Sequence, residues 1–116
     1  MSIDIDIDRL VIDIKTAASA VISQDVTELR GFSERQVKAL AKQAQMIATG
    51  IVKKEIDDDL QDFFLDSLED MALNFVKTLR GLLMVTIEKV WNAVISVIWQ
   101  AIESATGVKL GAPAAE

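Results

Sequence analysis

Cysteine and histidine are both absent from this sequence of 116 residues. Without Cys, the chain has no disulfide, no thiolate zinc site and no thiol nucleophile. Without His, it lacks the commonest metal ligand and the commonest general base. The sequence also has no Gly-rich phosphate loop and no Gly-x-Ser-x-Gly motif. We therefore expect no metal site, no cofactor and no catalytic residue, and we predict that the protein is not an enzyme.

Aromatic residues are scarce, at 5% of the sequence, although 51% of the residues are hydrophobic. The apolar surface is therefore made mainly of Ile, Leu, Val, Ala and Met, which suits the faces of helices better than an aromatic ligand pocket. Basic residues are in deficit, since 12 Lys and Arg stand against 18 Asp and Glu, and the net charge is −6. Because phosphate neutralisation needs an excess of cations, we expect that nucleic acid is not a partner.

Long uncharged apolar runs are absent as well. No stretch reaches 18 apolar residues without a charge, although residues 81–102 come close, with Glu88 and Lys89 as the only charged members. The first six residues lack the basic and apolar regions of a secretory signal. The sequence therefore predicts a cytoplasmic protein, and a membrane partner stays open as an alternative.

The N terminus alternates strictly between two residue types: Ile3, Ile5 and Ile7 with Asp4, Asp6 and Asp8. A period of two predicts a short extended arm over residues 1–8, which would need the sheet edge of a partner or of another copy. The alternative is a frayed tail that leads into the first helix. The three Asp residues resemble the first ligands of a calcium loop, but Arg9 and Lys15 occupy the positions that require Gly and Glu, which excludes an EF-hand loop.

Helical spacing of apolar residues begins at Leu10 and predicts a first helix over about residues 8–30, ended by Gly31. A second helix is expected to begin at Glu34. Its start has a capping box, formed by Ser33 and Gln36, and the apolar residues of a hydrophobic staple on either side.

The apolar pattern continues in helical phase past residues 57–59, where three Asp residues can cap a new helix. We favour a break near Asp57 over one long bent helix. A third helix is then expected from residue 58 to about residue 104, apolar around nearly its whole circumference from residue 82 to residue 102. The cover for this surface must come from the other helices, from other copies of the chain or from lipid.

The predicted fold class is therefore all-α, with two or three amphipathic helices, a long apolar C-terminal helix and a short extended N-terminal arm. We expect one helical domain over residues 1–107 and a flexible tail over residues 108–116, which contains the only proline, Pro113.

Charges are sorted along the chain. Residues 34–54 carry five cations and one carboxylate, whereas residues 55–70 carry eight carboxylates and no cation. If the chain turns near Asp57, the two blocks lie antiparallel, and we expect Lys38 and Lys42 to pair with Asp62 and Asp66. Exposed pairs of this kind contribute only about 0–1 kcal/mol each, so they set register more than stability.

Two short apolar segments of the last helix share a pattern: Trp91-Asn92-Ala93-Val94-Ile95 and Trp99-Gln100-Ala101-Ile102. This pattern resembles the apolar helical stretches of tape measure proteins in tailed phages, over about 20 residues. The chain is too short to be a tape measure itself. The resemblance implies a small helical virion or tail-associated protein, with other virion proteins as partners. The alternative is that both Trp residues anchor a helix–helix core.

From the apolar C-terminal helix we predict a structural protein that assembles as a helical homo-oligomer. The expected interface consists of one face of that helix: Leu83, Ile87, Val90, Trp91, Val94, Ile98, Trp99 and Ile102. The alternative is a peripheral or membrane-active protein that uses residues 82–102 as its lipid-facing surface.

Overall fold

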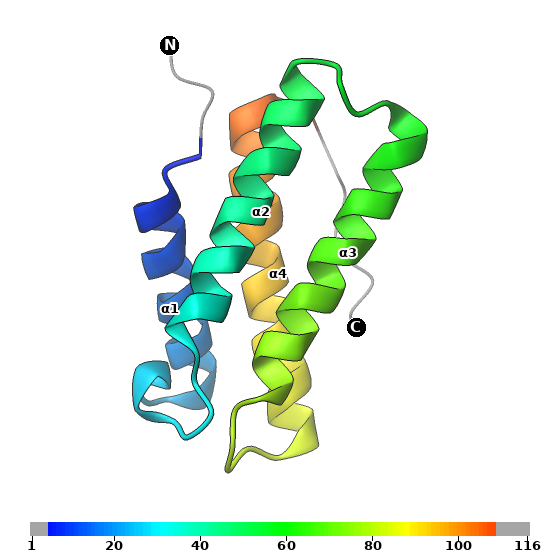
Figure 1. The fold of residues 1–116 in the computed structure, drawn as a ribbon. Coiled ribbons are helices and arrows are strands. Elements are labelled where there is room, and N and C mark those ends of the chain that lie inside the picture. The colour runs from blue at the N-terminus through cyan, green and yellow to red at the C-terminus, as the bar shows by residue number, and fades with distance from the viewer. Residues whose placement is uncertain (1–4, 109–116) are drawn as a thin grey trace.

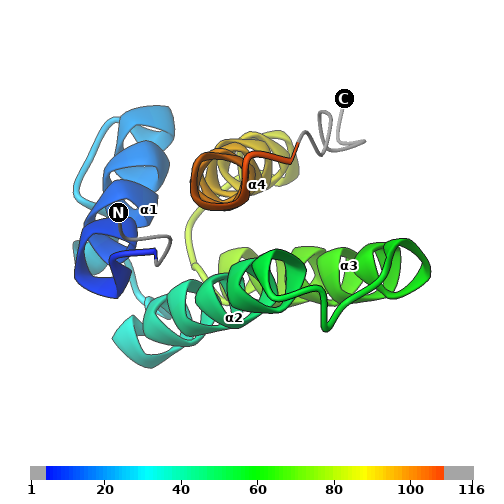
Figure 2. The same cartoon turned by 90° about the horizontal axis from the view of Figure 1, so that it is seen from above.

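The computed structural model of the protein describes residues 5–108, which form an all-α bundle. Its four α-helices are α1 (Ile7–Ile22), α2 (Glu34–Val52), α3 (Asp58–Lys77) and α4 (Met84–Thr106), with a short 3-10 helix, η1 (Val26–Glu28), after α1. Consecutive helices run in opposite directions (Figure 1). Helix α4 lies over the α2–α3 pair and beside α1 (Figure 2), so α4 contacts all three of the other α-helices.

The first helix is shorter than predicted. It ends at Ile22 because Ser23 adopts the left-handed conformation, with φ of 60°. The Ser19 hydroxyl then accepts a hydrogen bond from the Val26 N–H at 2.9 Å, and the Asp25 carboxylate accepts two from Thr27. These side chains capture backbone donors that a continuing helix would use, so the chain turns into η1.

The last two residues of the predicted arm over residues 1–8 belong to α1 instead. Asp6 caps α1 by accepting from the Arg9 N–H at 3.1 Å, so Ile7 and Asp8 are helical. Ile5 is buried, and its carbonyl accepts a hydrogen bond from the Gln45 side chain at 3.1 Å. Within residues 5–108 no strand is formed, and residues 1–4 lie outside the described part of the chain.

Helix α2 begins at Glu34, as predicted, and the Ser33 hydroxyl accepts from the Gln36 N–H at 3.2 Å. The Gln36 side chain has a different role from the one expected in a capping box, because its carbonyl oxygen lies 3.4 Å from the Thr78 hydroxyl. Phe32 packs edge-on against Phe75 of α3, with ring centroids 5.9 Å apart. The start of α2 is thereby joined to the end of α3.

The predicted break near Asp57 is confirmed. Lys53 and Lys54 end α2, and the Gly50 carbonyl accepts from the N–H groups of Glu55 and Ile56 at 2.8 and 3.1 Å. Asp57 then caps α3 by accepting from the Leu60 N–H at 3.0 Å. Helices α2 and α3 are therefore an antiparallel hairpin.

The prediction of one helix over residues 58–104 is wrong, because the chain reverses between α3 and α4. The Thr78 hydroxyl donates to the Phe75 carbonyl at 2.6 Å, and the Arg80 N–H leaves the helix to donate to the Arg30 carbonyl at 2.8 Å. Gly81 then takes a φ of 83°, which glycine adopts without strain. The described chain therefore has four α-helices where two or three were expected.

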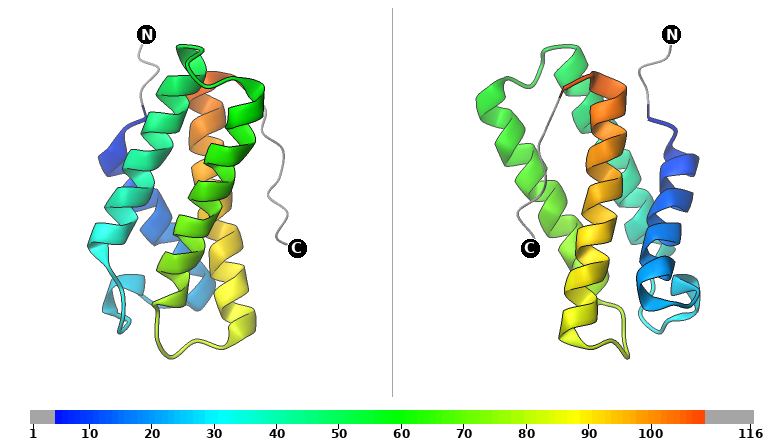
Figure 3. Two further views of the ribbon diagram at one scale, coloured as in Figure 1. Left: turned by 45° about the vertical axis from the view of Figure 1, so that its right-hand side comes forward. Right: turned by 180° about the vertical axis from the view of Figure 1, so that it is seen from behind.

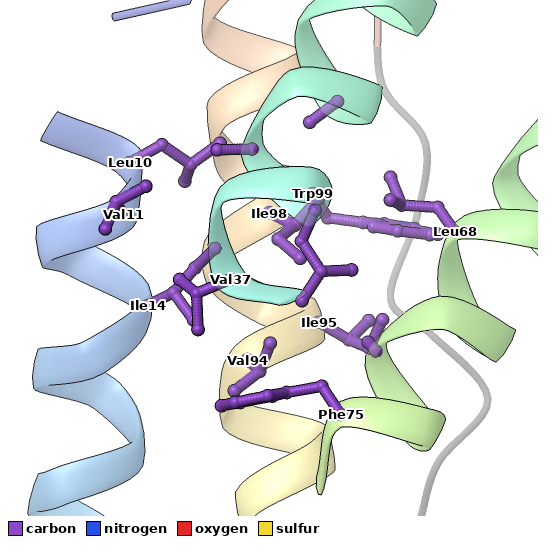
Figure 4. Packing of buried hydrophobic residues seen from close by; sticks show 14 of the residues in the cluster. Leu10, Val11, Ile14, Val37, Leu68, Phe75, Val94, Ile95, Ile98 and Trp99 are labelled. Carbon is purple, nitrogen blue, oxygen red and sulfur yellow. The ribbon is translucent and has the colours of Figure 1, made fainter. Parts of the chain in front are cut away.

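The core is a single cluster to which all four helices contribute, shown from close by in Figure 4. Leu10 and Ile14 of α1 point toward α2 and α4, while Leu68 and Phe75 of α3 approach α4 from the other side. Most of the large, fully buried side chains of the core are aliphatic, such as Ile98 of α4. The cover that α4 requires is thus supplied by the same chain.

Candidate interaction surfaces

Most of the predicted interface on α4 lies inside the bundle. Five of its eight side chains are buried: Val90, Val94, Ile98, Trp99 and Ile102. Ile87 and Trp91 are half-buried, and Leu83 is 73% exposed. The five buried residues cannot meet another copy unless the bundle opens. A surface for self-association on this helix is therefore limited to its first turns.

Trp91 is fixed to its neighbouring helix. Its indole Nε1–H donates to the Glu69 carbonyl of α3 at 3.2 Å, so the polar edge of the ring is satisfied within the chain. Next to it, the Asn92 Oδ1 atom is buried without a hydrogen-bond partner in the described structure. Trp91 therefore joins α4 to α3.

The predicted pairing of Lys38 and Lys42 with Asp62 and Asp66 is not formed. All four side chains are exposed, and no ion pair within 4.0 Å joins them in the described residues. The register explains this, because the contact between Thr78 and Gln36 places the start of α2 beside the end of α3. Lys38 therefore lies about ten residues along α3 from Asp66, or roughly 15 Å at the rise of an α-helix.

A cluster of exposed apolar side chains occupies the turn between α3 and α4. Leu83, Met84 and Val85 are consecutive and are exposed by 73%, 66% and 54%. The exposed cations Lys77 and Arg80 precede them along the chain. We call these five residues the cationic tip. Leu83 is also the N-cap of α4, a position where its apolar side chain cannot accept a hydrogen bond from the first turn.

A second exposed apolar cluster lies at the other end of α3. Leu60 and Phe63 are 46% and 63% exposed, and the Phe63 ring packs edge-on against Phe64 with centroids 5.5 Å apart. This end of α3 diverges from the neighbouring end of α4 in two views (Figure 1; Figure 3, right). The exposed carboxylates around it belong to Asp59, Asp62 and Asp66. We call these residues, Leu60, Phe63, Asp59, Asp62 and Asp66, the acidic patch.

The carboxylates of the acidic patch form no ion pair within 4.0 Å in the described residues. Burial raises the pKa of the Glu69 carboxyl, and the neighbouring negative charges of Asp66 and Asp70 raise this pKa further. No Lys or Arg occurs between residue 55 and residue 76. A cation that approached this face would therefore relieve repulsion among its carboxylates.

The sequence prediction placed Leu83 in the expected interface, but it did not single out the turn around Met84 or the exposure of Phe63, although two local signals were present. Phe63 and Phe64 are adjacent on a helix, so they point about 100° apart and cannot both face one core. Leu82, Leu83, Met84 and Val85 form a continuous apolar run beside Gly81, which is out of keeping with a helix that has one apolar face.

One broad hollow on the surface has charged residues that are already bonded to other groups of the chain. A broad hollow of about 650 Å³ lies along α1, and its charged residues are Lys15 and Asp25. The Lys15 ammonium pairs with Glu34 at 2.7 Å, and the Asp25 carboxylate accepts the Thr27 hydroxyl at 2.7 Å. Among the described residues, no group of three or more acidic side chains is arranged to hold a metal ion.

No helix among residues 5–108 combines the length and the apolar character needed to cross a membrane. Comparison with protein-family models, with characterised proteins and with solved structures found no match for the chain.

Proposed function

We propose that this protein is a structural component that assembles with copies of itself. The observation that carries the proposal is the cationic tip, where three consecutive apolar side chains are exposed although the bundle buries most of the large apolar side chains of α4. Exposed apolar clusters of this kind mark contact sites more often than scattered single residues do. The absence of Cys and His leaves little chemistry for an enzyme.

A comparison of free energies indicates that the cationic tip alone is not enough for stable association. Full burial of a Leu, Met or Val side chain contributes about 1.5–3 kcal/mol. Two chains lose about 4–15 kcal/mol of translational and rotational freedom when they associate. Burial of three partly exposed side chains therefore gives little net free energy of association. A stable contact needs a second apolar surface such as the acidic patch.

The biological setting of this assembly is proposed from the resemblance of residues 91–102 to tape measure proteins. The protein would be a small virion or tail-associated component of a tailed phage, in which symmetric packing of identical chains is common. Trp91 and Trp99 support the bundle core in the structure, so the resemblance concerns the packing character of the helix and names no partner.

The test is the mass of the protein in solution, measured by light scattering after gel filtration. We expect wild type to exceed the 12.7 kDa of one chain, and Leu83→Asp to reduce the mass toward that of the monomer. Ile12→Asp is the matched control, because Ile12 is 56% exposed on α1 and belongs to neither cluster. A wild-type protein that stays monomeric at tens of micromolar contradicts the proposal.

A second candidate is a peripheral membrane protein, and the tip is the feature that favours it. Leu83, Met84 and Val85 could enter the interface while Lys77 and Arg80 meet anionic headgroups. Liposome flotation with anionic and neutral vesicles distinguishes this candidate. Under our first proposal we expect no flotation, whereas flotation that depends on anionic lipid and is lost in Leu83→Asp would replace it.

A further inference from the structure

We propose that copies of this chain join head to tail, with the cationic tip of one copy on the acidic patch of the next. This inference rests on the proposed function, because it specifies which surfaces meet in the assembly. Its basis is that the two exposed apolar clusters carry opposite charge and lie at opposite ends of the bundle.

The positions of the clusters follow from α3. The acidic patch occupies the first turns of this helix, and Lys77 of the tip is its last residue. A helix of 20 residues is about 30 Å long. Figure 1 shows the turn that carries the tip at one end of the bundle and the start of α3 at the other. One copy cannot bring its own tip to its own patch, so the partner must be another chain.

The charges of the two surfaces are complementary. Lys77 and Arg80 at the tip hold no ion pair within the described residues, and the same holds for Asp62 and Asp66 at the patch. A contact between tip and patch would place cations beside carboxylates around the apolar side chains. Tip-to-tip and patch-to-patch contacts would place like charges together, which disfavours symmetric pairing.

The apolar side chains of the cationic tip and of the acidic patch are also suited to pack against each other. The tip presents Leu83, Met84 and Val85, which are aliphatic or flexible, and the patch presents Leu60 and the exposed ring of Phe63. A methionine side chain adapts well to an aromatic surface. Because the two surfaces differ, the interface is heterologous, and each added copy leaves one free tip and one free patch. Such an interface builds closed rings or open filaments.

The decisive experiment uses two variants that each block one surface. Leu83→Asp places a carboxylate on the tip, and Phe63→Lys places a cation on the patch; both sites are more than 60% exposed, so the fold should persist, which circular dichroism checks. We expect each variant alone to be monomeric by light scattering. An equal mixture should form dimers and nothing longer, because only one good tip and one good patch remain.

A contact between the blocked tip and the blocked patch would pair one exposed carboxylate with one exposed cation. Such a pair is too weak to join dimers into longer assemblies. Ile12→Asp, as the matched control, should assemble as wild type does. Association should also weaken as salt is raised, since the paired charges are exposed.

Several results would overturn the inference. If wild type is monomeric, the proposed function fails and the head-to-tail contact fails with it. If wild type assembles but Phe63→Lys assembles equally well alone, assembly is real and its geometry is different. A mixture that stays monomeric also rejects the contact. Vesicle flotation of wild type that Leu83→Asp abolishes and Phe63→Lys preserves would assign the tip to lipid instead.

Discussion

At the scale of single residues, Gly31 has the most constrained environment among the glycines in the turns. Its φ is 88°, and a Cβ atom at this position would overlap the carbonyl oxygen of Thr78. Gly81 has a similar φ of 83°, but a Cβ there would meet no atom within 4 Å. Substitutions at Gly81 and Gly31 therefore distinguish the cost of backbone strain alone from the cost of strain with steric overlap.

We predict that Gly31→Ala lowers the free energy of unfolding clearly more than Gly81→Ala. Left-handed backbone alone costs an L-residue about 1–2 kcal/mol, which is the expected effect at Gly81. At Gly31 the loop must also move away from Thr78, so we expect a total loss of about 3 kcal/mol or more. Urea denaturation followed by circular dichroism measures both, and equal losses would contradict the overlap.

Glu69 gives a prediction about pH. Its pKa is raised in the folded chain by burial first and by Asp66 and Asp70 next. The folded state therefore holds this proton more tightly than the unfolded state. The resulting penalty is absent below the unfolded pKa, appears as pH rises from there through the raised folded pKa, and is complete above it.

We accordingly expect Glu69→Gln to stabilise the protein at neutral pH, by a few tenths of a kcal/mol as is usual for surface substitutions. The gain should vanish when pH falls below about 4, where the unfolded carboxyl is also protonated. Thermal unfolding at both pH values checks this, with Asp8→Asn at an exposed site on α1 as a comparison. A gain that is independent of pH would reject the role of the carboxylate.

At the scale of helices, the register of α2 against α3 decides which charges meet. The basic and acidic helices are antiparallel neighbours, as the sequence predicted for a turn near Asp57, but the contact between Gln36 and Thr78 offsets the charged positions. Gly50, which weakens an isolated helix, has a packing role here, because the Ile56 side chain lies directly over it. Close packing at the ends of the two helices therefore determines their register, and exposed ion pairs do not.

We predict that reversing Lys38 and Lys42 to Glu changes the free energy of unfolding of the single chain by less than about 1 kcal/mol. The change should be similar at low salt and at about 1 M salt, because neither lysine forms an ion pair within 4.0 Å in the described residues. Lys15→Glu is the comparison, since Lys15 pairs with Glu34 at 2.7 Å. A large loss confined to low salt would show that the charged blocks do pair.

At the scale of the whole molecule, one core joins all four helices. Helix α4 supplies Val94 and Ile98 to this core, α1 supplies Ile14, and α3 supplies Phe75. No helix has an apolar cluster of its own that could stay folded when another leaves. The bundle should therefore behave as one cooperative unit.

We predict that unfolding monitored by Trp fluorescence and by circular dichroism gives coincident urea transitions. Ile14→Ala should lower the midpoint of both equally and cost about 2–5 kcal/mol, although Ile14 lies on α1 and both Trp residues lie on α4. Ile12→Ala, at an exposed site of the same helix, should change little. Separate transitions for the two probes would show that α1 unfolds independently.

The sequence by itself determined the features that depend on neighbours three or four residues away. The all-α class, the start of α2 after Ser33 and the cap at Asp57 are of this kind, because helical period and capping bonds are local. Tertiary structure alone decided the reversal at Thr78 to Leu83, where the Arg80 N–H bonds to Arg30, 50 residues earlier in the chain. Tertiary structure also decided what covers α4. The apolar surface of this helix requires burial against some partner, and the placement of α1, α2 and α3 buries most of it within one chain.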